Sequence, residues 1–227
     1  MYQRVARSAL HASLALVLLL TAGCASRKTT APGEESAGTH KVRAEAYLFD
    51  ARMHRDGKMN TFRLEVFQTD SVLGLGGRGY LGKGVLKGRM TRDSLEAYFP
   101  TASEWVHASI SELLESTACP ITVPDLNLIS LFTTLPDSAD WPAKILIESD
   151  YEDSNHPKFT VHMTDCPWKI EIEYDRQDAG WRIREFYFTD GESNDLRAER
   201  REYKAGVSVG SDKFAVLIPP DARRIIP

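Results

Sequence analysis

Imidazole and carboxylate side chains gather in the second half of the sequence, where they could bind a metal ion. His156 and His162 lie six residues apart, with Asp150, Glu152 and Asp153 close by in the chain. A metal site needs such ligands to converge on one ion. The stretch is better explained as an exposed acidic turn of a hairpin, so we predict no metal site here.

Neighbouring glutamates could act as a general acid and a general base. Glu171 and Glu173 alternate with Ile170 and Ile172, which places both carboxylates on the solvated face of a strand. The sequence contains no H-E-x-x-H motif, no G-x-S-x-G motif and no reactive cysteine constellation. We therefore predict a protein that is not an enzyme and needs no cofactor; a hydrolase is the weakest alternative.

Glycines between residues 74 and 84 match two nucleotide-binding patterns. Residues 74–79 fit G-x-G-x-x-G, and residues 77–83 fit the start of G-x-x-x-x-G-K, with Gly84 in place of the required Ser or Thr. Both patterns need a following helix whose N-terminal amides bind phosphate, whereas residues 85–89 continue as a strand. We predict no nucleotide partner and assign these glycines to bends and bulges of a strongly curved sheet.

The thiol of Cys24 stands directly after two small residues, Ala22 and Gly23. Before them comes an apolar run of about seven residues, far shorter than the ~20 that a membrane-spanning helix needs. Residues 1–24 resemble a bacterial lipoprotein signal. That resemblance implies cleavage before Cys24 and attachment of acyl chains such as palmitate, which would anchor the protein to a membrane. The alternative is an ordinary secretory signal with a chance cysteine.

Cys119 and Cys166 are the two remaining cysteines. In an exported chain such a pair is most simply a disulfide. It would close a loop of about 46 residues and add about 4 kcal/mol of stability in the chain-entropy model. The alternative is two buried free thiols.

Removal of the signal, residues 1–23, leaves 204 of the 227 residues and changes the net charge from −4 to −6, because two arginines are lost. This length suits one large domain, and the mild negative charge argues against a nucleic-acid partner. Residues 24–40 are rich in small, polar and charged residues and predict a flexible tether. The folded domain is expected over residues 41–220, followed by a tail of residues 221–227.

Alternation of apolar and polar residues predicts short strands on both sides of a central segment. Five strands come first, over residues 42–49, 62–67, 72–81, 84–91 and 94–99. Six more are expected over residues 144–149, 158–164, 168–174, 181–190, 195–203 and 214–218. The short turns between them indicate an antiparallel order.

The central segment has helical spacing instead. Residues 101–115 and 125–135 each place apolar side chains three and four positions apart. We therefore predict an α+β protein. Its strongly curved antiparallel sheet of about 10–11 strands would form a half-barrel closed by two or three short helices.

Several short stretches resemble the outer-membrane lipoprotein carrier and receptor family, LolA and LolB. They are the Gly-rich hairpin and residues 61–67, 94–100, 111–114, 121–126 and 180–183. The resemblance covers about residues 42–220 and implies an open half-barrel closed by helices around an apolar cavity for acyl chains. Because of Cys24 the chain looks more similar to LolB, itself a lipoprotein, than to the soluble LolA.

The resemblance also suggests which residues would contact lipid. Ten apolar residues are candidates for the cavity lining, although packing in an ordinary core is the alternative for each of them: Phe62, Leu64, Val66, Tyr98, Trp105, Leu128, Phe132, Trp168, Trp181 and Phe186. LolB uses an exposed leucine on a protruding loop to pass lipid to the membrane. Leu73 and Leu75 are the nearest match here.

The leading hypothesis is a membrane-anchored lipoprotein that binds acyl chains and takes part in lipid or lipoprotein transfer at the outer membrane, facing the periplasm. Its partners would be the membrane, other lipoproteins or a periplasmic carrier. The alternative is a non-catalytic interaction lipoprotein of an envelope complex, whose cavity is filled by its own side chains.

Overall fold

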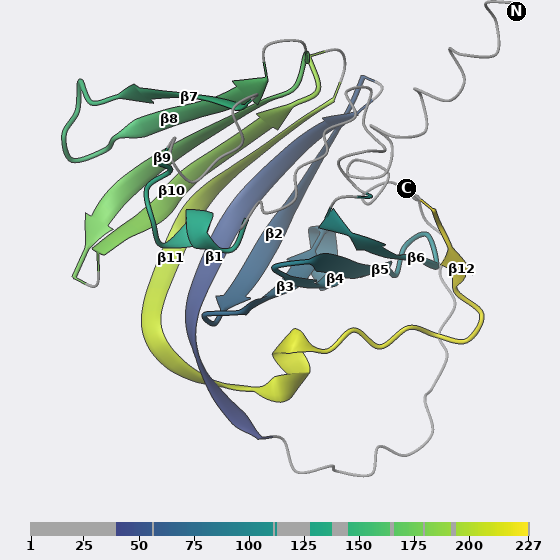
Figure 1. The fold of residues 1–227 in the computed structure, drawn as a ribbon. Coiled ribbons are helices and arrows are strands. Elements are labelled where there is room, and N and C mark those ends of the chain that lie inside the picture. The colour runs from purple at the N-terminus through teal and green to yellow at the C-terminus, as the bar shows by residue number, and fades with distance from the viewer. Residues whose placement is uncertain are drawn as a thin grey trace, which may run out of the picture.

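A computed structural model describes residues 40–55, 57–110, 112, 128–137, 145–163, 166–178, 180–191 and 194–226. Within them the chain forms one 12-stranded sheet (Figure 1). The predicted signal peptide, Cys24 and nearly all of the predicted tether lie outside the described residues.

The strands form two consecutive groups along the chain. The first group is β1 Lys41–Arg55, β2 Lys58–Gln68, β3 Val72–Arg78, β4 Gly84–Thr91, β5 Ser94–Phe99 and β6 Glu104–Ser109. The second group is β7 Ile145–Asp150, β8 Lys158–Met163, β9 Lys169–Gln177, β10 Gly180–Thr189 and β11 Asp195–Gly210. The short strand β12, Arg223–Arg224, and the 3₁₀ turns η1 Tyr80–Gly82, η2 Ser130–Phe132 and η4 Ser211–Phe214 complete the regular elements.

The sheet order is β12-β6-β5-β4-β3-β2-β1-β11-β10-β9-β8-β7. Each group is an antiparallel meander of sequence neighbours, and the two meanders meet where β1 pairs with β11. Among the described strands, β12 alone runs parallel to its neighbour, β6. The order begins at β12 and ends at β7, so the sheet stays open. In Figure 1 it curls, and β3 to β6 turn away from the direction of β8 to β11.

One face of the curled sheet, here called the inner face, carries the main core. In β1 the side chains of Tyr47, Phe49, Ala51 and Met53 are each at most 2% exposed, and the residues between them are more exposed. Strands β2, β3 and β8 to β11 add buried residues to the same cluster. Since each large apolar side chain contributes about 1.5–3 kcal/mol when buried, this face is the main source of stability.

The predicted α+β class is wrong, because the described chain is nearly all β and no described α-helix covers the sheet. Residues 104–109, expected in a helix, form strand β6. Glu104, Val106 and Ala108 are buried there with a two-residue period. The two-residue period of a strand was hidden in the sequence, because one of the buried positions is the charged residue Glu104. Its carboxylate pairs with Arg223 of the C-terminal segment.

The second predicted helix is also absent where the structure describes it. Residues 130–132 form the single 3₁₀ turn η2, and residues 113–127 lie outside the described part of the chain. Helical backbone among the described residues is limited to the three 3₁₀ turns and to Ile110 and Glu112, next to that gap.

The C-terminal residues 211–226, here called the strap, also differ from the expectation. The strand expected over residues 214–218 is absent, because Phe214 belongs to η4 and residues 215–219 have no regular structure. The sheet instead continues into the predicted tail, where β12 pairs with the edge strand β6. The strap therefore runs from the central strand β11 to the far edge of the sheet (Figure 1).

Gly74 in β3 allows the strap to pass close over the outer face, the face opposite the main core. A Cβ atom at this position would lie 2.3 Å from the backbone oxygen of Lys213 and 3.1 Å from the ring of Phe214. Backbone atoms cannot rotate away, so only a residue without a side chain fits under η4.

This close approach predicts that Gly74→Ala loosens the strap. We expect a loss of about 1–3 kcal/mol in the free energy of unfolding, measured by urea denaturation, because the new methyl group overpacks against backbone. Gly76→Ala is the matched control on the same strand and face, where the nearest atoms of Glu65 would lie 3.8 Å away. Equal stability of the two variants would contradict the proposed contact.

Candidate functional site

The inner face is covered by residues 128–135, here called the covering segment, which includes η2. Ile129 and Leu131 are 3% and 6% exposed and belong to the main core cluster, and Leu128, Phe132 and Leu135 pack against it. In Figure 1 the segment crosses in front of the central strands. The chain thus fills part of its own concave face with apolar side chains.

Side chains from the sheet bond to the backbone carbonyls of the covering segment. Gln68 Nε2 of β2 donates to the carbonyl of Ile129 at 3.3 Å. The Tyr174 hydroxyl of β9 donates to the carbonyl of Leu131 at 2.9 Å, and burial raises the pKa of this phenol. The segment's own backbone donors bond locally, as in Phe132 N to Ile129 O at 3.2 Å. Side chains rather than strand pairing therefore hold it in place.

Tyr47 of β1 contributes mainly through its ring. The ring meets that of Phe132 edge-on, with centroids 5.6 Å apart. Its single hydroxyl proton has the carboxylate of Glu45 as nearest acceptor, at 2.8 Å, while the carbonyl of Phe132 is 3.4 Å away. Burial and then the hydrogen bond to Glu45 raise the pKa of Tyr47. The phenol is therefore neutral at physiological pH.

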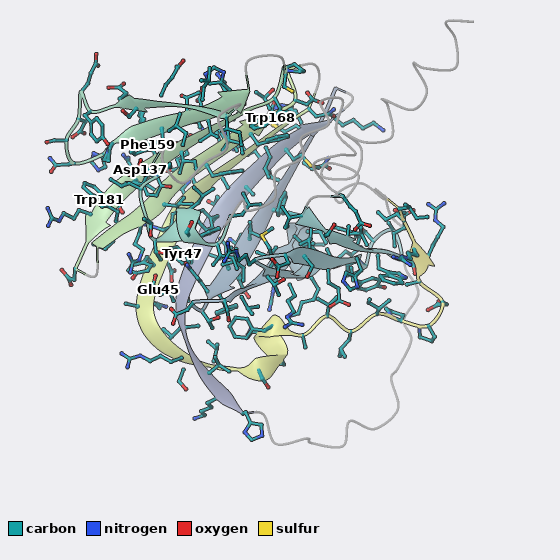
Figure 2. All side chains as sticks on the ribbon, in the orientation of Figure 1. Glu45, Tyr47, Asp137, Phe159, Trp168 and Trp181 are labelled. Atoms are coloured by element: carbon teal, nitrogen blue, oxygen red, sulfur yellow. The ribbon has the colours of Figure 1, made fainter. Side chains whose placement is uncertain are left out.

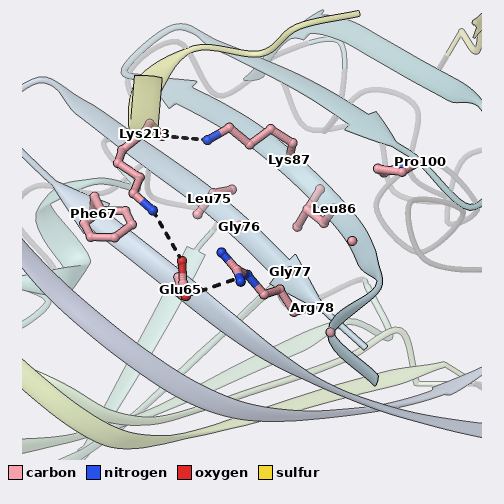
Figure 3. A pocket seen from close by; sticks show the side chains of 12 residues that line it. Glu65, Phe67, Leu75, Gly76, Gly77, Arg78, Leu86, Lys87, Pro100 and Lys213 are labelled. Carbon is pink, nitrogen blue, oxygen red and sulfur yellow. Dashed lines mark hydrogen bonds and ion pairs between the residues drawn. The ribbon is translucent and has the colours of Figure 1, made fainter. Parts of the chain in front are cut away.

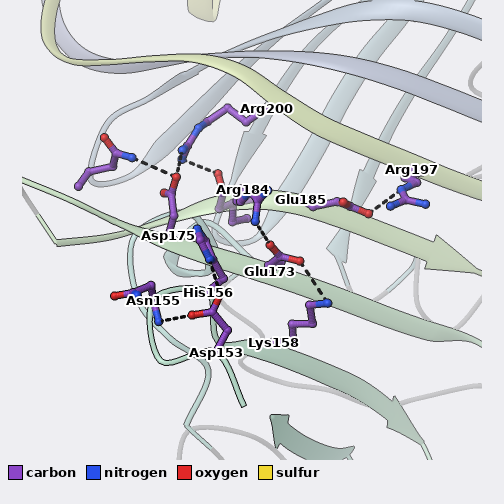
Figure 4. Close-up of polar contacts among 12 residues, drawn as sticks. Asp153, Asn155, His156, Lys158, Glu173, Asp175, Arg184, Glu185, Arg197 and Arg200 are labelled. Atoms are coloured by element: carbon purple, nitrogen blue, oxygen red, sulfur yellow. Dashed lines mark hydrogen bonds and ion pairs between the residues drawn. The ribbon is translucent and has the colours of Figure 1, made fainter. Parts of the chain in front are cut away.

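An arginine-filled seam lies beside the covered face. Strands β10 and β11 pair only between Glu185/Glu199 and Thr189/Asp195 and then separate. Arg200 of β11 enters the opening, where it donates to the carbonyl of Ile183 at 2.8 Å. It also pairs with Asp175 of β9 (Figure 4). The guanidinium thus supplies a donor to one backbone carbonyl of β10 where the two strands no longer pair.

A second arginine joins this seam to β1. Arg182, whose side chain is 6% exposed, bonds Glu45 at 2.6 Å and the Tyr203 hydroxyl at 3.1 Å. The rings of Tyr47 and Tyr203 lie 5.2 Å apart. Breaking one partner of such a buried pair leaves the other uncompensated, so this contact stabilises the link between β10 and β1.

The structure brings seven of the ten predicted lipid-contacting residues together in or against the main core cluster: Phe62, Leu64, Val66, Leu128, Phe132, Trp181 and Phe186. Trp168 instead packs in a separate small cluster with Ile145 and Val161. Figure 2 shows Trp168 and Trp181 near opposite ends of the neighbouring strands β9 and β10.

Tyr98 and Trp105 lie on the outer face, so they are not part of the inner cluster. The two residues are register partners between β5 and β6, and Tyr98 alternates with the buried residues Ala97 and Phe99. The guanidinium of Arg224 lies 5.3 Å from the centre of the Trp105 ring. Alternation along β5 and β6 therefore separates both rings from the concave side.

The predicted membrane-contact leucines are not on an exposed loop. Leu73 is 2% exposed in the main core, and Leu75 packs against both larger clusters. The exposed apolar pair is found at the next turn, the hairpin tip of residues 79–83, where Tyr80 is 85% and Leu81 78% exposed. The sequence reasoning missed this pair, although the flanking Gly79 and Gly82 are typical turn residues.

The histidines and glutamates bind separate partners. His156 Nδ1 lies 2.7 Å from Asp153, and His162 Nε2 lies 3.2 Å from Glu148. Glu173 pairs with Lys158 at 3.5 Å and with Arg184 (Figure 4). No group of three or more potential metal ligands occurs within the described ranges. These residues therefore make pairwise side-chain contacts with different partners.

Cys166 is disulfide-bonded, but its partner lies outside the described residues. The pairing of Cys119 with Cys166 therefore stays a prediction. In the part of the chain that the structure describes, no helix has the length and apolar character needed to cross a membrane.

The fold defined by these elements is an open, curled antiparallel sheet whose concave face is covered by the chain itself. No protein-family model and no curated protein sequence matches the chain. Similar solved structures include a LolA superfamily protein from Nitrosomonas europaea, with 9% identity, a TM-score of 0.36 and coverage of 76% of this chain and 90% of that one.

Two further solved structures are similar at the same level. An uncharacterized conserved protein from Thermus thermophilus has 11% identity and a TM-score of 0.41, over 79% of this chain and 89% of that one. A DUF1329 family protein from Desulfovibrio piger has 10% identity and a TM-score of 0.39, over 80% and 92%. The similar structures thus include a member of the superfamily that the sequence resembled.

The hydrogen bond from Tyr174 predicts how firmly the covering segment is held. Tyr174→Phe leaves the buried carbonyl of Leu131 without its donor, at a cost of about 1–3 kcal/mol. We expect faster hydrogen–deuterium exchange at the amides of residues 132–134. Tyr187→Phe is the control, because that hydroxyl has no hydrogen-bond partner among the described residues. Unchanged exchange in Tyr174→Phe would mean that packing alone holds the segment.

Proposed function

We propose that the protein is an envelope lipoprotein that binds acyl chains on the inner face, in the place that the covering segment occupies here. The observation that carries this proposal is the attachment of the segment. Its apolar side chains lie on a floor built from several strands, yet side-chain hydrogen bonds are its polar links to that floor. Such a segment can leave without breaking the sheet.

The energies make this exchange reasonable. Exposing Ile129 and Leu131 costs about 3–6 kcal/mol, at 1.5–3 kcal/mol for each side chain. Burying one methylene of an acyl chain returns about 0.8 kcal/mol. About four to eight buried methylenes therefore offset the exposure of these two side chains, which is fewer than a membrane lipid chain contains. Binding would need no covalent chemistry and few oriented polar contacts.

The hairpin tip is the part that we expect to touch the membrane. Tyr80 and Leu81 are both strongly exposed, and Leu81 has a φ of 60°, a conformation that costs a non-glycine residue about 1 kcal/mol or more. A large apolar side chain held there, exposed and strained, favours a role in contact with an apolar phase. The tip replaces Leu73 and Leu75 in the proposal.

The proposed setting completes this picture. Acylation at Cys24 would tether the domain to the outer membrane on its periplasmic side, and cargo would arrive from other lipoproteins or from a periplasmic carrier. The second candidate function is an interaction lipoprotein of an envelope complex that binds no lipid. The burial of Ile129 and Leu131 in the core favours this second function, because these side chains already occupy the part of the inner face where an acyl chain would bind.

Truncation of Leu131 separates these two functions. If acyl chains bind where Leu131 packs, the Leu131 side chain competes with them for the same surface, and Leu131→Ala removes that competition. We expect the affinity for a fluorescent fatty acid to rise about tenfold, the equivalent of 1.4 kcal/mol. Leu95→Ala is the control, since Leu95 is buried to a similar degree in the second cluster. Both variants should lose about 2–5 kcal/mol of stability.

A measurement on the wild-type protein provides the result that could contradict lipid binding. Native mass spectrometry of the wild-type protein purified from cells should detect co-purified lipid. Absence of lipid, together with no gain of fatty-acid binding in Leu131→Ala relative to Leu95→Ala, would reject the lipid-binding proposal and leave the interaction lipoprotein.

The tip can be tested without disturbing its backbone. Leu81→Asn keeps a residue that tolerates positive φ but removes the apolar surface. In the full chain carrying Cys24→Ser, we expect a severalfold loss of binding to phospholipid vesicles, measured by co-sedimentation. Met59→Asn removes another exposed apolar side chain, 61% exposed, from a different hairpin. Equal effects of the two substitutions would contradict a specific role of the tip.

A further inference from the structure

A separate cavity of about 320 Å³ lies beside the hairpin tip. Its charged lining comes from the outer face: Glu65, Gly76 and Lys87 are register partners across β2, β3 and β4, and Glu65 alternates with the inward-facing Leu64 and Val66. η4 of the strap adds Lys213 (Figure 3). The charged groups of the cavity thus lie on the face opposite the lipid-binding face proposed above.

Cations dominate this cavity. Among the described residues, the charged side chains that line it are three cations, Arg78, Lys87 and Lys213, and one carboxylate, Glu65. Arg78 Nε and Lys213 Nζ lie 3.9 Å and 3.8 Å from the Glu65 oxygens (Figure 3). Both distances exceed a normal hydrogen bond. Among the described residues Glu65 is the one partner of the Arg78 guanidinium, so most of its donors remain available to a ligand.

Lys87 is fixed in the wall of the cavity. Its ammonium group donates to the carbonyls of Asp212 and Lys213, at 3.0 Å and 3.3 Å. Burial first, and then the positive charge of Lys213, lower the pKa of Lys87, while the carboxylates of Asp212 and Glu65 oppose the shift. An ammonium has three donors, which leaves one for a further acceptor. A bound anion would relieve the repulsion between the two lysines.

Glycines expose the backbone between these cations. Gly76, Gly77, Gly82 and Gly84 all line the cavity. They belong to residues 74–84, whose sequence matches nucleotide-binding patterns, although a strand and not a helix follows them. A Cβ at Gly76 would touch only Glu65 atoms, at 3.8 and 3.9 Å, so a side chain there would occupy the cavity without straining the sheet.

We propose that this cavity binds a phosphate group, as carried by the head group of an anionic membrane lipid, while Tyr80 and Leu81 enter the apolar layer. Arg78 and Gly82 line the cavity and flank these two tip residues, which brings head-group binding and apolar contact to one point. A guanidinium and two ammonium groups are the donors that phosphate oxygens prefer. The proposal rests on the membrane contact of the tip, not on acyl binding by the inner face.

The test uses the full chain carrying Cys24→Ser, so that no acyl anchor contributes, and vesicles of phosphatidylcholine with or without phosphatidylglycerol. We expect Arg78→Gln/Lys213→Gln to weaken binding to phosphatidylglycerol vesicles about thirtyfold, from about 1 kcal/mol for each cation near an anionic surface. Lys158→Gln/Lys169→Gln removes the same charge from β8 and β9 and should change binding less than about twofold.

A second variant separates a shaped site from general attraction between charges. Gly76→Val keeps every cation and fills the cavity, so it should weaken binding to phosphatidylglycerol vesicles as the double variant does. Urea denaturation of each variant verifies the fold. Wild-type affinity in Gly76→Val, or equal losses in the two double variants, would overturn the proposal.

Inorganic phosphate identifies the source of the ligand. If millimolar phosphate shifts the NMR amide signals of Gly76 and Gly77 and displaces the protein from vesicles, the site binds phosphate itself and soluble phosphorylated molecules are included. If the vesicles bind and phosphate does not, the lipid head group is the ligand. Fatty-acid binding should be unchanged in Arg78→Gln/Lys213→Gln, so failure here would not be confused with failure of the acyl-binding proposal.

Discussion

The antiparallel pairing of β1 with β11 is the connection on which the rest of the structure depends. It runs from Lys41/Gly210 to His54/Asp195. It joins the first meander to the second, because every other antiparallel pair among the described strands links strands that follow one another in the chain. Register shifts after Ala44 and Leu48 bend this pair. This bend contributes to the curl of the sheet, as do the register shifts between β3 and β4 and between β9 and β10.

The two faces of this curled sheet have different chemistry. The inner face is apolar and covered by a segment from the connection between the meanders, and its few polar groups, such as Tyr174, bind that segment's carbonyls. On the outer face the strap places Lys213 beside Lys87 and Arg78. One sheet can therefore offer an apolar surface and a cationic one within the thickness of a single layer.

Sequence patterns predicted most strands because burial alternates along them. The bounds of β4 and β5 agree with the prediction, and Leu95, Ala97 and Phe99 show the simple two-residue period. The prediction failed at β6, where the buried residue is Glu104 and its partner, Arg223, lies 119 residues away. No local pattern contains that information. The position of Leu81 was missed for a similar reason, since exposure of a leucine depends on where the hairpin ends.

The pairing of β1 with β11 also has a consequence for the order of folding events. The centre of the sheet can form only when residues near position 41 pair with residues near position 210, far away in the sequence. Such long-range closure slows folding. Until it is complete, the first meander presents β1 as an unpaired edge, which is a site for aggregation. We therefore expect the chain to fold slowly and to benefit from chaperones until β11 has paired with β1.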